Sequence, residues 1–259
     1  MKKTEAVTPP DVVEKLLKAA GTDVVLVGGQ ALAVWIRRYG LAVPDDVAAI
    51  TADVDFLTPS AADRDTVKRF AKALQGQAHF PNIRALTSLV GQAWKDISDD
   101  EYLNVDVIFD VLGITPEQVR QRSVAVEAGD IRFLVMHPLH VLRSRLINLY
   151  KVPDKQNEKG CVQLALAIAV ARAYLGEVAG KASAASLASG RSPLQGLVSE
   201  VERMALEDAG RKVARRHGLH VADAIDPSLI PAGPFWTRKW PALSRLMSRE
   251  HAAMFRAPA

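Results

Sequence analysis

The chain has 259 residues, of which 49% are hydrophobic and 24% charged, ordinary values for a globular protein. This length is enough to bury a full hydrophobic core in one large domain or two smaller ones. A single cysteine, Cys161, excludes an internal disulfide, fits a reducing compartment and has the apolar neighbours of a core residue.

The N-terminal residues lack the apolar core of a signal peptide, and the longest uncharged apolar run, residues 161–171, is too short to cross a bilayer. We therefore expect a soluble, cytoplasmic protein without membrane contact. Residues 1–136 carry 15 basic and 19 acidic side chains, a net charge of −4, whereas residues 137–259 carry 18 and 10, a net charge of +8. A basic second half suits a polyanionic partner, and a solvated basic helix surface explains the same numbers equally well.

The first predicted elements form a helix and then a strand, a tight turn and a second helix. Residues 11–20 have apolar side chains at helical spacing, and residues 24–27 are four consecutive aliphatic residues typical of a buried strand. Gly28 and Gly29 follow at once, and apolar side chains then recur at helical spacing. Backbone N–H groups at such a turn can approach a phosphate closely, although most glycine pairs before a helix are only tight turns.

Two aspartates mark the next predicted strand. Side chains two residues apart in a strand point to the same face, so Asp53 and Asp55 should project together, with Val54 and Phe56 on the opposite face. A D-x-D motif alone is more often a turn than a metal site.

A third aspartate, Asp106, falls within a later apolar strand at residues 103–109. Unpaired charges on buried strands cost several kcal/mol or more unless a cation or hydrogen-bond donors compensate them. A divalent ion that prefers oxygen ligands, such as Mg²⁺, would compensate three carboxylates.

The remaining elements follow from periodicity and capping signals. Thr115 and Pro116 have the sequence of a helix N-cap and first turn. The other predicted elements are a helix at 61–74, one or two strands within 83–94, a hairpin of 123–126 with 131–135, helices at 139–150, 159–175 and 194–217, a loose connection at 179–193 and a loop at 226–234. His137 and His140 are three residues apart but have no further cysteine or histidine nearby, so we do not expect a zinc site.

The order of the glycine pair, the D-x-D motif and the third aspartate resembles the nucleotidyltransferase superfamily that includes DNA polymerase β. Residues 26–32 and 51–57 look most like its AbiEii-type branch, which contains toxin components of type IV toxin–antitoxin systems and many bacterial proteins of unassigned role. The likeness covers residues 24–110 at the level of motifs. It implies an α+β fold, with a nucleotidyltransferase-type mixed β-sheet and flanking helices at 1–136, followed by a mainly helical, basic domain at 137–259.

The resemblance also implies roles for named residues. Asp53, Asp55 and Asp106 would be the catalytic, metal-binding acids, holding Mg²⁺ or Mn²⁺. The nucleotide-binding residues would be Gly28, Gly29, Gln30, Thr51, Lys155 and Lys159, although each lysine taken alone is better explained as a solvated surface residue. Asp110 stays outside the predicted site.

The implied activity is transfer of a nucleoside monophosphate from an NTP to an acceptor, which in toxin-like members is RNA, with an antitoxin protein as a partner. The alternatives are an aminoglycoside-type small molecule as acceptor, protein nucleotidylation, or a degenerate binding or antitoxin-like module. Two departures leave room for the last alternative. The segment between Gly29 and Asp53 is longer than such families usually have, with an insert at residues 39–50. In addition, Ala49 stands where relatives often carry a basic residue, for which Arg37 or Arg38 would have to substitute.

Overall fold

The computed structural model describes residues 3–43, 52–82, 84–182, 186 and 192–256. The chain divides into two compact units. The first contains Met1–Arg37 and Pro44–Ser144, and the second contains Arg38–Val43 and Arg145–Ala259. The sequence places the boundary after residue 136, whereas this division falls within a helix, at Ser144.

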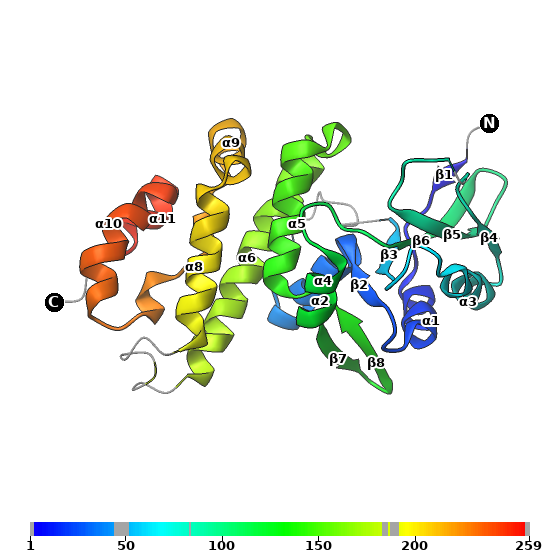
Figure 1. The fold of residues 1–259 in the computed structure, drawn as a ribbon, viewed down its shortest axis with the longest axis horizontal. Helices are drawn as coiled ribbons and strands as arrows, with labels where there is room; N and C mark the ends of the chain where they lie inside the picture. Colours follow the sequence, from blue (N-terminus) through cyan, green and yellow to red (C-terminus); the bar gives the residue numbers. More distant parts are fainter. Residues whose placement is uncertain (1–2, 44–51, 83, 183–185, 187–191, 257–259) are drawn as a thin grey trace. The chain divides into compact units, whose positions relative to one another are not determined.

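The first unit is built on one mixed eight-stranded sheet with the order β4-β5-β6-β3-β2-β8-β7, and β1 pairs with β6 outside this path. Figure 1 shows β2, β3 and β6 side by side, as the strand pairing requires. The strands are β1 (Thr4–Glu5), β2 (Val25–Val27), β3 (Val54–Leu57), β4 (Gln77–His79), β5 (Leu89–Asp96), β6 (Glu101–Ile108), β7 (Val124–Ala128) and β8 (Ile131–Val135).

Three helices of this unit, α1 (Pro10–Ala20), α2 (Gly28–Tyr39) and α4 (Pro116–Arg122), begin within one residue of the predicted position, whereas the helix predicted at 61–74 begins only at Arg64. Pro10 occupies the first position of α1, and α2 starts directly after β2. The helix α4 has a complete capping box, in which the Thr115 hydroxyl accepts from Gln118 N and the Gln118 side chain accepts from Thr115 N.

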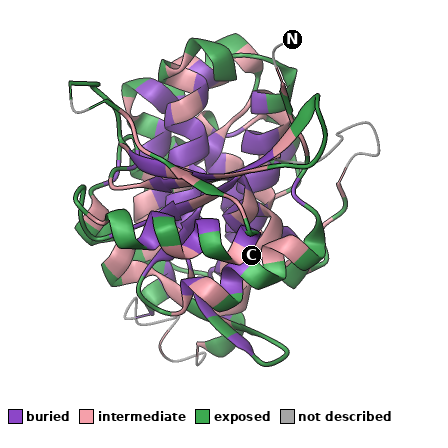
Figure 2. Cartoon of the chain, turned by 90° about the vertical axis from the view of Figure 1, so that its right-hand side faces the viewer, coloured by how far each residue is buried: buried purple, intermediate pink, exposed green. Residues whose placement is uncertain are grey.

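One part of the hydrophobic core of the first unit lies between the sheet and α3 (Arg64–Leu74). Phe56 of β3 stacks on Phe70 of α3, with ring centroids 4.4 Å apart. Val105 and Val107 of β6 are also fully buried, because alternate residues of a strand share one face. Purple segments in Figure 2 mark these buried strands and inner helix faces. The aspartates of β3 and β6 therefore belong to the other face.

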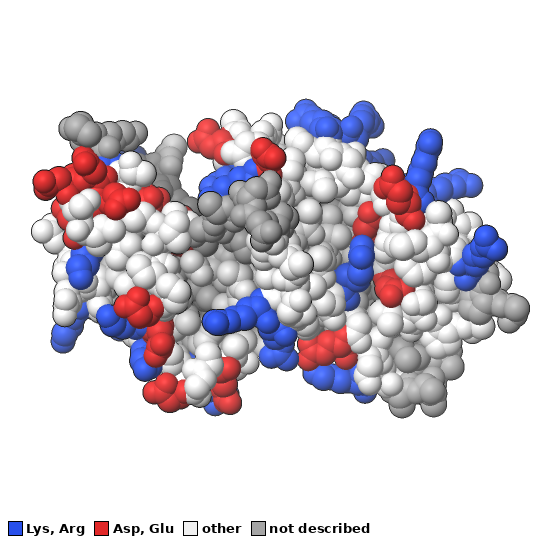
Figure 3. All heavy atoms as spheres, turned by 180° about the vertical axis from the view of Figure 1, so that it is seen from behind, with Lys and Arg blue, Asp and Glu red and all other residues white. Residues whose placement is uncertain are grey.

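The second unit is mainly helical. Its elements are the last residues of α5 (Pro138–Lys151), then η1 (Pro153–Lys155), α6 (Glu158–Lys181), α8 (Pro193–Leu206), α9 (Asp208–His217), η2 (Val221–Ala224), η3 (Pro227–Leu229), the π-helical η4 (Phe235–Lys239), α10 (Trp240–Leu243), η5 (Ser244–Leu246) and α11 (Arg249–Ala253). On the face drawn in Figure 3, the basic side chains of this unit are interspersed with acidic ones.

The helix α6 is longer than the predicted 159–175. Among the described residues it is the one helix whose length and composition also suit a bilayer span, with a mean hydropathy of 1.5 over its most apolar 18-residue window. Here it packs against α8 and η2, and 44% of that window is buried. The core helix of a water-soluble protein passes the same test, so α6 alone is weak evidence for a membrane.

Two sequence predictions for the second unit are wrong. The single helix expected at residues 194–217 is two helices, because Glu207 between α8 and α9 has extended backbone angles. The turn is tight, since a Cβ on Gly210 would lie 2.3 Å from the carbonyl oxygen of Met204. Cys161 is half-buried rather than in the core, and its Sγ lies 3.5 Å from Nδ1 of His217.

Candidate metal centre

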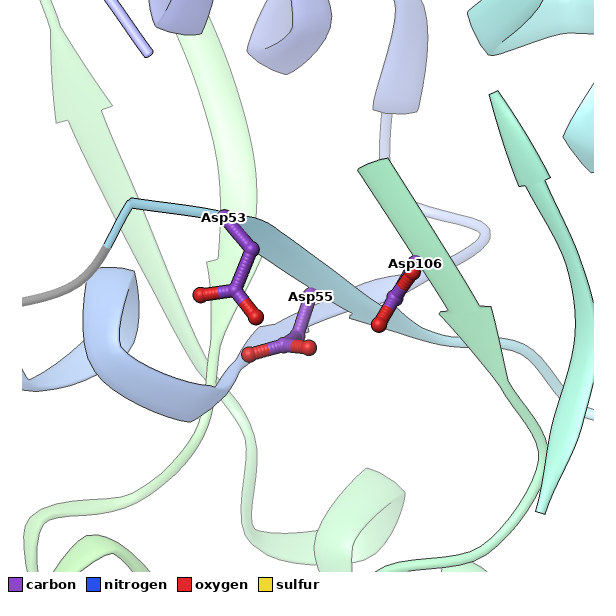
Figure 4. Close-up of side chains that lie close together, drawn as sticks. All are labelled: Asp53, Asp55 and Asp106. Carbon is purple, nitrogen blue, oxygen red and sulfur yellow. The ribbon is translucent and has the colours of Figure 1, made fainter. Parts of the chain in front are cut away.

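Three neighbouring strands bring the predicted acids together. In the parallel pairing of β3 with β6, Asp55 lies directly beside Asp106, and in the antiparallel pairing of β2 with β3, Val27 lies beside Asp55. Asp53 occupies a bend one residue before β3, not the strand itself as the D-x-D pattern predicts. Its carboxylate nevertheless points toward the other two (Figure 4).

The three carboxylates form a compact cluster. One oxygen from each of Asp53, Asp55 and Asp106 lies within 4.8 Å of the others, and all three residues are half-buried. Within the described part of the chain, no other group of three or more acidic, histidine or cysteine side chains is close enough to share an ion. Carboxylate oxygens are the ligands that Mg²⁺, Mn²⁺ and Ca²⁺ prefer, so this cluster has the chemistry to hold a divalent cation.

A contact with Asp55 explains the glycine at the start of α2. Gly28 has a φ of +67°, which strongly favours glycine. A Cβ at this position would also lie 1.8 Å from Oδ2 of Asp55, far inside van der Waals contact. The backbone of the turn between β2 and α2 therefore lies against the Asp55 carboxylate, with no room for a side chain at position 28.

The position of Asp53 is fixed through the residue before it. The backbone N–H of Thr8 donates to the carbonyl oxygen of Ala52 at 3.0 Å, and the hydroxyl of Thr8 donates to the same oxygen at 2.9 Å. Thr8 is 4% exposed. These two buried bonds hold the bend from which the Asp53 side chain projects.

Asp106 is held by two neutral amides. Gln92 on β5 and Asn104 on β6 each donate a side-chain N–H to Oδ1 of Asp106 at 2.9 Å. Gln92 lies directly across from Asp106 in the antiparallel pairing of β5 with β6, and Asn104 is two residues earlier on the same strand, so all three share one face.

Burial dominates the electrostatics of Asp106. Burial raises the pKa of its carboxyl above the ordinary value, the bonds from Gln92 and Asn104 act in the opposite direction, and the charge of Asp53 raises it further. Neither hydrogen-bond partner is a cation. A bound dication would offset the repulsion between the acids.

The other predicted nucleotide-binding residues do not all lie beside the acid cluster within the first unit. Gly29 is buried and Gln30 half-buried in the first turn of α2, whereas Thr51 and most of the insert fall outside the described residues. Lys155 in η1 and Lys159 in α6 are exposed and belong to the second unit. Within that unit Arg38 pairs with Glu177 at 3.2 Å, so this candidate for the missing basic residue has a carboxylate partner of its own. Asp110 is exposed and is not part of the cluster.

The sequence analysis missed Gln92, Asn104 and Thr8. Gln92 lies in a stretch where the strands could not be delimited, and its role depends on the β5–β6 register. Asn104 had a usable signal, because a polar residue two positions before Asp106 on an apolar strand must share its face.

No protein-family model and no curated protein matches this sequence. The functional conclusion therefore depends on the acid cluster and its surroundings.

Proposed function

We propose that this protein is a nucleotidyltransferase that uses Mg²⁺ or Mn²⁺ to move a nucleoside monophosphate from an NTP to a hydroxyl-bearing acceptor. The observation that carries the proposal is the convergence of Asp53, Asp55 and Asp106 beside the Gly28 turn. The motif order, with a glycine pair, a D-x-D motif and a later acid, gives the same indication through its resemblance to that superfamily.

The proposed reaction breaks one phosphorus–oxygen bond and forms another. The acceptor hydroxyl oxygen bonds to the α-phosphorus of the NTP, pyrophosphate leaves, and the hydroxyl proton passes to a base. When bound, the divalent cation supplies positive charge beside the phosphate oxygens. Asp53 and Asp55 would hold it, and Asp106 would act as a further ligand or as the base.

The start of α2 suits the nucleotide phosphates. Its first turn contains no acidic residue, and backbone N–H groups at a helix N-terminus attract anions. The Asp55 carboxylate occupies the side of Gly28 where a Cβ would lie, so a bound cation is needed to bring an anionic phosphate to this turn. Gly29 and Gln30 follow in the same turn, and Lys155 and Lys159 remain predictions for phosphate binding.

We propose RNA as the acceptor, with an antitoxin protein as a partner, on the strength of the resemblance and of the net charge of +8 on residues 137–259. A small cationic acceptor is the second candidate. It is favoured by the exposed acidic side chains of Asp99, Asp100 and Glu101 at the β5–β6 turn. Such a turn attracts amines and repels phosphates.

Labelled nucleotide transfer tests the activity. The protein is incubated with each α-³²P-labelled NTP and Mg²⁺, together with total tRNA, with an aminoglycoside or with protein alone. We expect label on one acceptor class with the wild type and none with Asp55→Asn. The matched control is Asp110→Asn, which removes an exposed acid outside the cluster and should leave transfer unchanged.

The outcomes separate the alternatives. Transfer to tRNA whose KM rises steeply with salt supports an RNA acceptor, and weakly salt-dependent transfer to an aminoglycoside supports the small cationic one. Cation-dependent NTP binding without transfer to any acceptor would indicate the binding module and would overturn the enzymatic proposal.

A further inference from the structure

The two oxygens of the Asp106 carboxylate are in different situations. Oδ1 accepts hydrogen bonds from both Gln92 and Asn104 at 2.9 Å. A carboxylate oxygen has two lone-pair positions in the plane of the group, so two donors fill Oδ1. Oδ2 is then the oxygen left to coordinate an ion.

The burial of Asn104 is unfavourable for the stability of the fold. Asn104 is 5% exposed, and its Oδ1 is a buried acceptor with no hydrogen-bond partner among the described residues. Burying an unsatisfied carbonyl oxygen is unfavourable, and leucine would fill a similar volume without this cost. The N–H bond to Asp106 is the interaction that a leucine could not make.

The backbone places the two donors beside the carboxylate. Gln92 and Asp106 are cross-strand partners in the β5–β6 ladder, and Asn104 lies on the same strand as Asp106. Both donors therefore start from backbone positions on the same face of the sheet as the carboxylate. Rotation of the carboxylate into a position where both oxygens face one ion would break both bonds.

We propose that Gln92 and Asn104 are positioning residues that restrict Asp106 to coordination through one oxygen, and that they thereby make the cluster selective for Mg²⁺ and Mn²⁺ over Ca²⁺. Mg²⁺ requires compact octahedral coordination, whereas Ca²⁺ takes six to eight oxygens and commonly binds both oxygens of a carboxylate. This inference rests on the cation site of the proposed function but is independent of the transfer reaction.

Competition for the metal site tests the proposal without any activity measurement. Free Mn²⁺ is followed by electron paramagnetic resonance during titration of the metal-free protein, and Mg²⁺ or Ca²⁺ is then added as competitor. The variants are Gln92→Met and Asn104→Leu, which keep approximate size but remove the donor, and Asp110→Asn is the control. We expect each donor variant to change the ratio of the Ca²⁺ and Mg²⁺ dissociation constants by about 10-fold in favour of Ca²⁺.

The ratio distinguishes positioning from a merely structural role. A variant that only loosens the fold weakens both ions together and leaves the ratio unchanged, and that result would overturn the inference while leaving the cation site intact. If the wild type binds no Mn²⁺, both the inference and the cation site of the proposed function fail. Gln92 is half-buried, so Gln92→Met gives a result even if Asn104→Leu does not fold.

Discussion

The two units each contain a carboxylate with several hydrogen-bond donors, and the donors differ in kind. In the second unit, Glu177 accepts from Lys181, from the Tyr39 hydroxyl at 2.8 Å and from Arg38 at 3.2 Å. In the first unit, Asp106 accepts from two neutral amides and has Asp53 and Asp55 as neighbours.

The pKa values respond in opposite directions. The bond from Lys181 is the main reason that the pKa of Glu177 falls from its ordinary value of 4.5 to about 2, with Tyr39 contributing next. Burial is the main reason that the pKa of Asp106 rises. Glu177 has two cationic side-chain donors, Lys181 and Arg38, whereas the two side-chain donors to Asp106 are neutral amides. The two acids therefore differ both in burial and in the charge of their hydrogen-bond donors.

The largest expected effect comes from removing an acid of the cluster. Asp55→Asn removes the carboxylate between Gly28 and Asp106. Substitutions of residues that only contact metal ligands lower metal affinity by up to about 100-fold, so loss of a ligand itself should lower the affinity for Mn²⁺ by more than that. Correspondingly, Mg²⁺ at 100 times its dissociation constant should stabilise the wild type by about 2.7 kcal/mol and this variant hardly at all. Calorimetric titration and urea unfolding measure the two quantities. Equal Mg²⁺ stabilisation of both proteins would contradict a site at Asp55.

A pair of glycine variants isolates the contact between the turn and the cluster. Gly28 and Gly129 have φ values of +67° and +62°, but only at Gly28 would an added Cβ meet another residue. Gly129→Ala should lose about 1–2 kcal/mol of unfolding free energy through backbone strain alone. Gly28→Ala should lose more, and should also weaken Mn²⁺ binding because Asp55 must move. Equal losses at the two positions in urea unfolding would argue against a tight contact.

Neutralising the structural acid has a smaller effect, which depends on pH. Glu177→Gln should lower the unfolding free energy at pH 7 by about 1 kcal/mol, a typical value for a partly exposed charged hydrogen bond. Because the pKa of Glu177 is lower in the folded state, this stabilisation is fully present above about pH 4.5 and is lost as the pH falls toward about 2. Urea unfolding at pH 7 and pH 3 should therefore show a smaller difference between wild type and variant at pH 3. A constant difference would show that the charge is not responsible.

The smallest expected effect has the opposite sign. In metal-free protein, Asp53→Asn should stabilise the fold by a few tenths of a kcal/mol, because the charge of Asp53 raises the pKa of Asp106 and therefore opposes its ionisation. With saturating Mn²⁺ the same variant should be less stable than the wild type. Thermal unfolding with and without Mn²⁺ checks both signs, and destabilisation in both conditions would show that Asp53 behaves like Glu177.

Local sequence signals were enough to predict the central buried strands of the first unit. The apolar run before Gly28 and the alternation around Asp55 and Asp106 predict buried strands, and strand periodicity places their acids on one face. The sequence could not show the register between strands, which brings Gln92 opposite Asp106, because register depends on pairing between distant segments. It also missed the break at Glu207, since the apolar spacing on either side continues as in one helix.

The near-contact between Gly28 and Asp55 also constrains the order in which substitutions can accumulate. As long as the aspartate is present, a side chain at position 28 collides with it, so position 28 is the less replaceable of the two. Once position 55 has become glycine, the collision disappears, and residues that tolerate a positive φ, such as asparagine, become acceptable at position 28. Loss of the side chain at 55 is therefore the permissive first step, and a library at position 28 should yield folded variants other than glycine mainly in an Asp55→Gly background.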